Sequence, residues 1–177
     1  TGAELELFGE LSDHISANVS ATYADSRYPS DCAQGVAVAA LASTQRLCGQ
    51  DLTNAPRFAG VVGLTYDGPL NSSDWRLLVN GNLSYSDSRT TRTIDRDTNG
   101  LPTPLARQEN YVKANARVGL TTPDGRFTFE VWGTNIFNEI TRSISANTPL
   151  RGPAGARSLI GFVEEPRMYG ATVRTVF

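Results

Sequence analysis

The stretch Tyr169-Gly170-Ala171-Thr172-Val173-Arg174-Thr175-Val176-Phe177 alternates between two kinds of side chain. Because successive residues of a β-strand point to opposite sides, Tyr169, Val173 and Phe177 share a mostly apolar face, while Arg174 lies on the other face. The first face suits lipid, whereas hydrocarbon would not tolerate the charge on the second. This apolar-out, polar-in alternation is typical of a strand in a transmembrane β-barrel.

Six earlier segments have a comparable pattern. Segment 75–86, for example, sets Val79 and Leu83 against Asn80 and Asn82. Each segment is long enough for a tilted strand to cross a bilayer, which takes about nine to eleven residues. With the final segment, the chain therefore has seven predicted strands: residues 3–11, 15–28, 57–66, 75–86, 110–120, 126–137 and 166–177.

The predicted connections alternate between short and long. The short ones, near residues 13, 70 and 124, are rich in turn-forming residues. The long ones, 29–56, 87–109 and 141–165, are unusual for a compact soluble domain. Transmembrane barrels combine short periplasmic turns with long external loops. Aromatic residues also group near the strand ends, which predicts a belt at each membrane interface: Tyr23, Phe58, Tyr85, Tyr111, Phe137 and Tyr169 near the long loops, and Tyr66, Trp75, Phe127 and Phe177 near the turns.

Composition narrows the functional classes. The 177 residues are enough for one domain, and a net charge of −2 argues against a nucleic-acid partner. No apolar run approaches the roughly 18 residues that a transmembrane helix needs. A barrel strand needs no such run, because only every second residue contacts lipid.

Cys32 and Cys48 lie sixteen positions apart in a polar, turn-rich segment. Two cysteines without further ligands do not form a zinc site, so we expect a disulfide and an oxidising compartment. Two unrelated free thiols are the alternative. Between them, residues 36–42 are apolar and helix-friendly, which suggests a short helix in this external loop, either contacting substrate or acting as a structural lid.

Three motifs carry a family resemblance. Gly133-Thr134-Asn135-Ile136-Phe137-Asn138-Glu139 is similar to a penultimate strand that usually reads Asn-Leu-Phe-Asp. Residues 165–177 are similar to a closing strand with Pro-Arg, an aromatic-Gly pair and a final Phe, and residues 54–58 to an earlier loop-to-strand junction. On these residues the chain resembles the C-terminal part of the β-barrel of a TonB-dependent outer-membrane receptor. Ile136 and Asn138 depart from the usual Leu and Asp.

The resemblance implies an all-β fold: a transmembrane antiparallel β-barrel, of which residues 1–177 would form about the last seven strands, sixteen to twenty-two of 22. It implies an outer-membrane receptor of a Gram-negative bacterium that actively imports an iron-siderophore, haem, cobalamin or oligosaccharide. The partners would be the plug domain and remaining barrel strands of the same protein, the TonB complex through a missing N-terminal region, and outer-membrane lipid. Tyr169, Val173 and Phe177 resemble the signal that barrel assembly machinery recognises.

The odd strand number agrees with a piece of a larger barrel, because bacterial single-chain barrels use even numbers. An open sheet in lipid would also leave backbone groups unpaired at both edges. A passive porin-like or small outer-membrane barrel and a soluble all-β carbohydrate-binding or adhesion domain remain the alternatives.

Alternation places several polar and aromatic side chains on the predicted lumen face, where they could contact a ligand or the plug: Arg57, Arg76, Lys113, Arg117, Glu130, Trp132 and Arg174. Pairing of these charges with one another across neighbouring strands is the simpler interpretation.

No constellation predicts catalysis or a resident cofactor. His14 lies in a short turn, and the pair Glu164-Glu165 is best interpreted as a solvated surface. Asp95, Asp97 and Asn99, followed by a glycine, have the spacing of a calcium loop, but the Glu expected at the twelfth position is missing. An ordinary polar turn would have the same residues.

Overall fold

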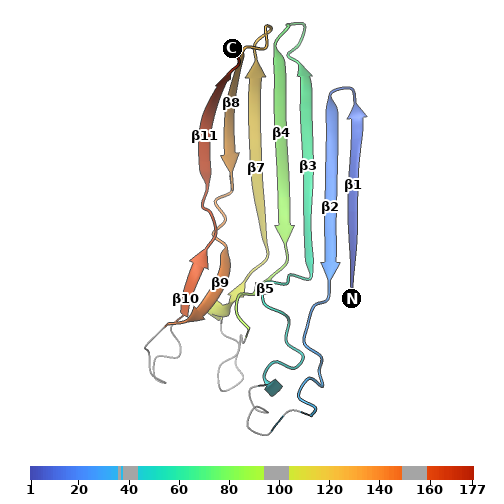
Figure 1. Ribbon diagram of the computed structural model, residues 1–177, viewed down its shortest axis with the longest axis vertical. Helices are drawn as coiled ribbons and strands as arrows, with labels where there is room; N and C mark the ends of the chain where they lie inside the picture. Colours follow the sequence, from blue (N-terminus) through green and yellow to red (C-terminus); the bar gives the residue numbers. More distant parts are fainter. Residues whose placement is uncertain (36, 38–43, 94–103, 149–158) are drawn as a thin grey trace.

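The structure is a computed structural model that describes residues 1–35, 37, 44–93, 104–148 and 159–177. It consists of one seven-stranded antiparallel sheet in the order β1-β2-β3-β4-β7-β8-β11, with smaller elements at one end (Figure 1). The strands of the main sheet are β1 (Gly2–Ser12), β2 (Ile15–Ala24), β3 (Phe58–Pro69), β4 (Arg76–Ser86), β7 (Tyr111–Thr121), β8 (Phe127–Thr134) and β11 (Met168–Thr175).

All seven predicted strands are present, but three end earlier than predicted, the seventh at Thr175 rather than at 177. The second ends at Ala24 rather than at 28, because the chain leaves the main sheet before Arg27. The Arg27 side chain pairs with Asp25 at 2.6 Å, and its backbone forms an isolated antiparallel β-bridge with Asp51. The sixth ends at Thr134 rather than at 137, because Asn135 adopts a left-handed backbone conformation with φ of 48°. A strand cannot continue through that conformation.

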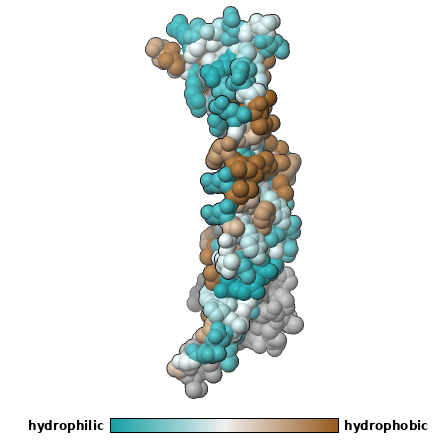
Figure 2. All heavy atoms as spheres, turned by 90° about the vertical axis from the view of Figure 1, so that its right-hand side faces the viewer, coloured by the Kyte–Doolittle hydropathy of each residue, from teal (hydrophilic) through white to brown (hydrophobic). Residues whose placement is uncertain are grey.

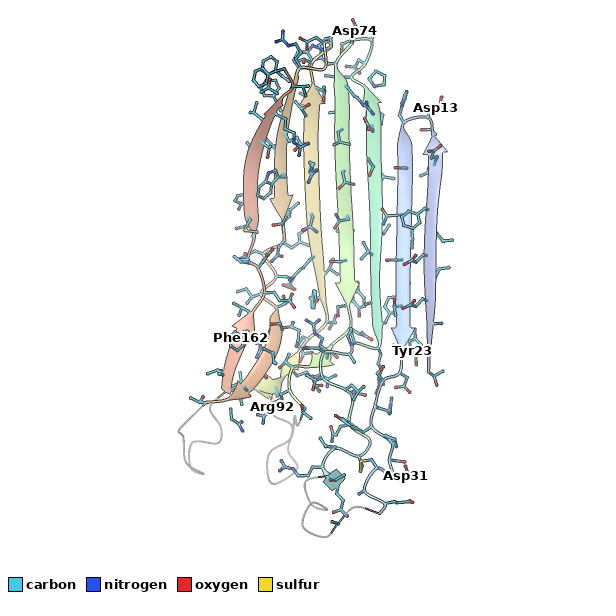
Figure 3. The ribbon with its side chains drawn as sticks, in the orientation of Figure 1. Asp13, Tyr23, Asp31, Asp74, Arg92 and Phe162 are labelled. Atoms are coloured by element: carbon cyan, nitrogen blue, oxygen red, sulfur yellow. A yellow bond between two sulfur atoms is a disulfide. The ribbon has the colours of Figure 1, made fainter. Side chains whose placement is uncertain are left out.

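The long connections contain two small sheets that the sequence did not predict. β5 (Arg89–Thr90) pairs with β6 (Arg107–Gln108), after the 3-10 helix Pro104–Ala106, and β9 (Arg142–Asn147) pairs with β10 (Leu159–Val163). β5 and β6 are too short to show a period. Figure 3 shows Arg92 and Phe162 at this loop end and Asp13 and Asp74 at the opposite, short-turn end.

The strand registers give the main sheet two distinct faces. On one, Val19, Val62, Leu83 and Ala114 lie side by side across four strands. On the other, Thr65, Asn80, Arg117 and Trp132 lie side by side. Seen from the β1 edge, apolar side chains gather at mid-height with hydrophilic ones beside and beyond them (Figure 2).

In the part of the chain that the structure describes, no second layer packs against the apolar face. Among the described residues, the only buried apolar side chains are Ala106 and Ala114, whereas Leu64, Val131 and Val173 are more than half exposed. So large an apolar surface is unfavourable in water and marks a lipid- or protein-facing surface. Phe8, 82% exposed, is an exception among the exposed apolar side chains, because it lies on the polar face together with Glu6 and Glu10. None of the described helices has the length and apolar character needed to cross a membrane.

One aromatic assignment is wrong. Tyr111 was expected in the belt near the long loops, but its register partner is Ser86, which places it on the polar face with Lys113. Its hydroxyl accepts a hydrogen bond from Arg89 at 3.0 Å, and the Arg89 and Lys113 charges each lie 5.4 Å from its ring centre. The belt near the long loops therefore lacks this member.

The family-like motif around Asn135 is explained by its backbone. Asn135 and Asn138 both have positive φ, and asparagine tolerates this conformation better than most residues. The Asn135 side chain is 4% exposed; its amide nitrogen donates to the carbonyls of Glu139 and Glu165, and its oxygen accepts from the Glu139 N–H. Asn135 thus closes β8 and ties the two ends of the following loop together.

Candidate functional site

Polar side chains cover the middle of the polar face as hydrogen-bonded pairs between neighbouring strands. Asn80 donates to Thr65 at 2.8 Å, and Asn115 donates to Asn82 at 2.9 Å. The sheet therefore presents an ordered hydrophilic surface on the face that a barrel would enclose.

The charges on this face find their partners in different ways. Arg174 pairs with Glu130 on the adjacent strand at 3.7 Å, so the predicted cross-strand pairing applies to these two. Arg76 makes a two-pronged contact with Asp67 on β3, at 2.6 and 2.8 Å. Arg57 and Lys113 pair instead with carboxylates of the long loops, Asp51 and Glu164. Mutual pairing is therefore wrong for most of the predicted set.

Arg117 and Trp132 face each other across β7 and β8. Arg117 is exposed and has no ion pair among the described residues. Trp132 is fixed in place, because its indole N–H donates to the Thr172 hydroxyl at 3.3 Å and its ring lies over Gly170, where a β-carbon would collide with it. A free cation beside an immobilised indole is the most available binding pair on this face.

A partly buried ionic cluster, which sequence analysis missed, lies where the long loops meet the polar face. Glu164 accepts hydrogen bonds from Arg89 at 3.0 Å, from Lys113 at 2.7 Å and from Thr141 at 2.7 Å. Arg89 is 9% exposed and also donates to Ser86 and Tyr111. The expectation that Glu164 belongs to a solvated surface is therefore wrong, because the loop fold brings two cations onto it.

Burial raises the pKa of Glu164, but hydrogen bonds from Lys113 and Thr141 and the charges of Lys113 and Arg89 outweigh it. The net result is a pKa below the ordinary value of 4.5. The contribution of Glu164 to stability is therefore complete above that ordinary value and is lost as the pH falls through the lower folded value.

Replacing Glu164 by Gln is expected to weaken the loop end by about 2 kcal/mol, because charge-assisted hydrogen bonds are lost and two cations lose their counter-charge. Amide hydrogen exchange of β5, β6 and β9 measures this, and the loss of protection at acid pH should disappear in the variant. The matched control is Glu165→Gln, since the Glu165 side chain is exposed and forms no ion pair with any described residue. Equal protection in the two variants would contradict the assignment.

Direct hydrogen bonds join the two loop regions beyond this cluster. The hydroxyls of Thr91 and Ser145 lie 2.7 Å apart, and the Ser145 N–H donates to the Thr91 carbonyl. The Gln108 side chain accepts from the Arg142 N–H at 2.8 Å. The connection between β4 and β7 and the one between β8 and β11 thus form one body at the loop end.

The predicted disulfide is present. Cys32 and Cys48 are bonded, with their Cα atoms 5.3 Å apart, in the loop between β2 and β3. The same loop is held to itself by the Tyr28 N–H, which donates to the Gln50 carbonyl at 2.9 Å. The short helix predicted at 36–42 falls mostly outside the described residues.

Replacing both Cys32 and Cys48 by Ser is expected to make the segment 29–56 more sensitive to protease. On the chain-entropy model, the bond lowers the entropy of the unfolded loop and so stabilises the folded loop by roughly 3 kcal/mol. Limited proteolysis with mass spectrometry of the fragments measures the effect. A reductant should mimic it in the unmodified protein and change nothing in the variant. Identical cleavage before and after reduction would exclude a stabilising role.

The predicted calcium residues Asp95, Asp97 and Asn99 lie outside the described residues, so that site stays a prediction. Within the part of the chain that the structure describes, no group of three His, Cys, Asp or Glu side chains could hold a metal ion. His14 is exposed in its turn, with its ring 6.2 Å from that of Tyr66.

Comparison with known proteins gives this architecture a family. The model of the "TonB dependent receptor-like, beta-barrel" family matches residues 1–138. A search of curated proteins returned no match. Among solved structures, the chain is similar to the ferric yersiniabactin uptake receptor FyuA from Yersinia pestis, with a TM-score of 0.74 and 15% identity over 99% of this chain and 23% of that one.

Two further structures have the same fold. BauA, the ferric preacinetobactin receptor from Acinetobacter baumannii, gives a TM-score of 0.64 and 16% identity over 97% of this chain and 21% of that one. Fiu, the ferric-catecholate import receptor from E. coli K12, gives a TM-score of 0.61 and 17% identity over 99% of this chain and 20% of that one. The chain thus spans about a fifth of the length of the proteins it matches. From its matched residues and the register of its sheet, the chain belongs to the β-barrel family of TonB-dependent receptors.

Proposed function

We propose that the complete protein containing this chain is an outer-membrane receptor of a Gram-negative bacterium that binds an iron-siderophore and imports it with energy from the TonB complex. The observation that carries this proposal is the agreement of fold with proteins named as ferric-siderophore receptors, FyuA, BauA and Fiu among them. Haem, cobalamin or an oligosaccharide has no comparable support.

In this proposal residues 1–177 form the C-terminal part of the barrel wall. The two edge strands support it: β1 and β11 run in the same direction, from the loop end to the short-turn end (Figure 1). They cannot pair with each other in an antiparallel barrel, so further strands would close the wall between them. The plug domain and the earlier strands would be supplied by the rest of the protein.

The polar face would then line the lumen. Arg117 and Trp132 are the proposed contacts for the plug or an anionic, aromatic ligand. The other cations of the predicted lumen face each pair with a carboxylate: Arg57, Arg76, Lys113 and Arg174. The body at the loop end, fixed by Glu164, would form part of the mouth. The stapled loop between Cys32 and Cys48 is the proposed first contact with substrate.

The test is uptake of radioactive iron-siderophore complexes by cells that carry or lack the complete protein. Uptake is expected to require the protein, TonB and an energised inner membrane. Passage that continues without TonB would support a passive porin, and competition by haem or cobalamin would redirect the ligand assignment. A monomer that is soluble without detergent would instead favour the carbohydrate-binding or adhesion domain.

A further inference from the structure

A shallow groove of about 290 Å³ crosses the apolar face between β7, β8 and β11. On the apolar face it is lined by Ala116, Val118, Val131, Gly133, Ile136 and Tyr169. Arg117 and Trp132, which by register belong to the polar face, also border it. The floor is low because Ala116, Gly133 and Tyr169 are register partners, and two of these three carry little or no side chain.

The groove is open to the surroundings of the sheet. Val131 is 59% exposed and Tyr169 is 69% exposed, so none of the described residues covers the groove. Ile136 folds back over Gly133, with its Cγ1 3.4 Å from where a β-carbon of Gly133 would stand. Ile136 therefore forms one side of the groove next to Gly133.

A cation stands beside this depression. The guanidinium of Arg167 lies 5.5 Å from the centre of the Tyr169 ring, which is the same ring that forms one wall. Arg167 is exposed and has no carboxylate within ion-pair distance in the described part of the chain. Stacking on a ring holds a guanidinium plane while leaving its N–H donors free for a phosphate.

We propose that this groove is a specific seat for a phosphate-bearing lipid, with one acyl chain lying over Ala116 and Gly133 and the phosphate bound by Arg167. An apolar channel with a cation next to one wall matches the two halves of such a lipid. Tyr169 joins the halves, because an interfacial tyrosine presents an apolar body to the chain and a ring face to the cation. The inference requires the apolar face to lie in lipid, and it does not depend on what the protein imports.

The test uses the complete protein, purified in detergent, stripped of lipid and titrated with phosphatidylglycerol while native mass spectrometry counts bound lipids. Arg167→Gln is expected to weaken retention of one lipid roughly tenfold, because a charge-assisted contact is lost. Ala116→Leu, which fills the floor without changing charge, should also weaken it. The matched controls are Arg126→Gln at the short-turn end and Ala21→Leu on β2, and neither should have an effect.

Each result decides the proposal. Equal losses in Arg167→Gln and Arg126→Gln would reduce the effect to general charge, and an unchanged affinity in Ala116→Leu would remove the acyl seat. Displacement of the lipid by inorganic phosphate at the same concentration would indicate a free-phosphate site instead. Any of these outcomes overturns the inference. Loss of iron uptake is not the readout, so a failed lipid test leaves the proposed import function standing.

Discussion

Replacing Val62 by Arg is expected to lower the free energy of unfolding of the complete protein in lipid by about 2–4 kcal/mol, the cost of a cation near the middle of a barrel's lipid face. Val62 lies between Val19 and Leu83 on the apolar face and is 48% exposed. No carboxylate occupies these neighbouring positions, so the guanidinium would have to leave water without a partner.

The neighbouring residue supplies a matched control. Val61 is also a valine, in the same strand, but its register partners are Ser20 and Ser84 on the polar face. Val61→Arg should therefore change stability little. Denaturant unfolding in lipid vesicles measures the free energy of unfolding of both variants. The two substitutions replace the same residue type at almost the same depth. Equal losses would mean that the two faces do not meet different surroundings, and the lipid assignment would fail.

The seven strands could be predicted because alternation is a strong and local signal. In β4, the apolar Val79 and Leu83 lie on one face and the polar Asn80 and Asn82 on the other, and membrane strands are long enough to repeat the period several times. The same alternation correctly placed Lys113, Arg117 and Glu130 on one face. The pairing of Cys32 with Cys48 could also be inferred, because the chain has no other cysteine.

The loop end could not be predicted, because its contacts join residues far apart in the sequence. Arg89 and Glu164 are separated by 75 positions, and only the loop fold brings them together. Nothing in the local pattern distinguishes Glu164, which carries the cluster, from the exposed Glu165. Strand ends failed for a related reason: the positive φ at Asn135 is a backbone event that apolar periodicity does not report.

Deleting Phe177 is expected to lower the amount of the protein in the outer membrane several-fold while leaving the fold of the purified protein intact. Phe177 is fully exposed, so its side chain packs against nothing in the described residues. The last backbone hydrogen bond of the closing strand, from the Val176 N–H to the Arg126 carbonyl at 3.0 Å, does not involve Phe177. Little stability should therefore be lost with the residue.

If the side chain is nevertheless required, its role must lie in recognition before or during insertion, together with Tyr169 and Val173 on the same face. Quantitative immunoblots of outer-membrane fractions measure the level, and refolding into detergent micelles measures the intrinsic fold. Phe162→Ala, which removes another exposed phenylalanine from β10 at the loop end, is the control and should leave the level unchanged. Normal membrane levels without Phe177 would show that the final strand is not read as an assembly signal, whereas a failure to refold in micelles would assign the residue a structural role instead.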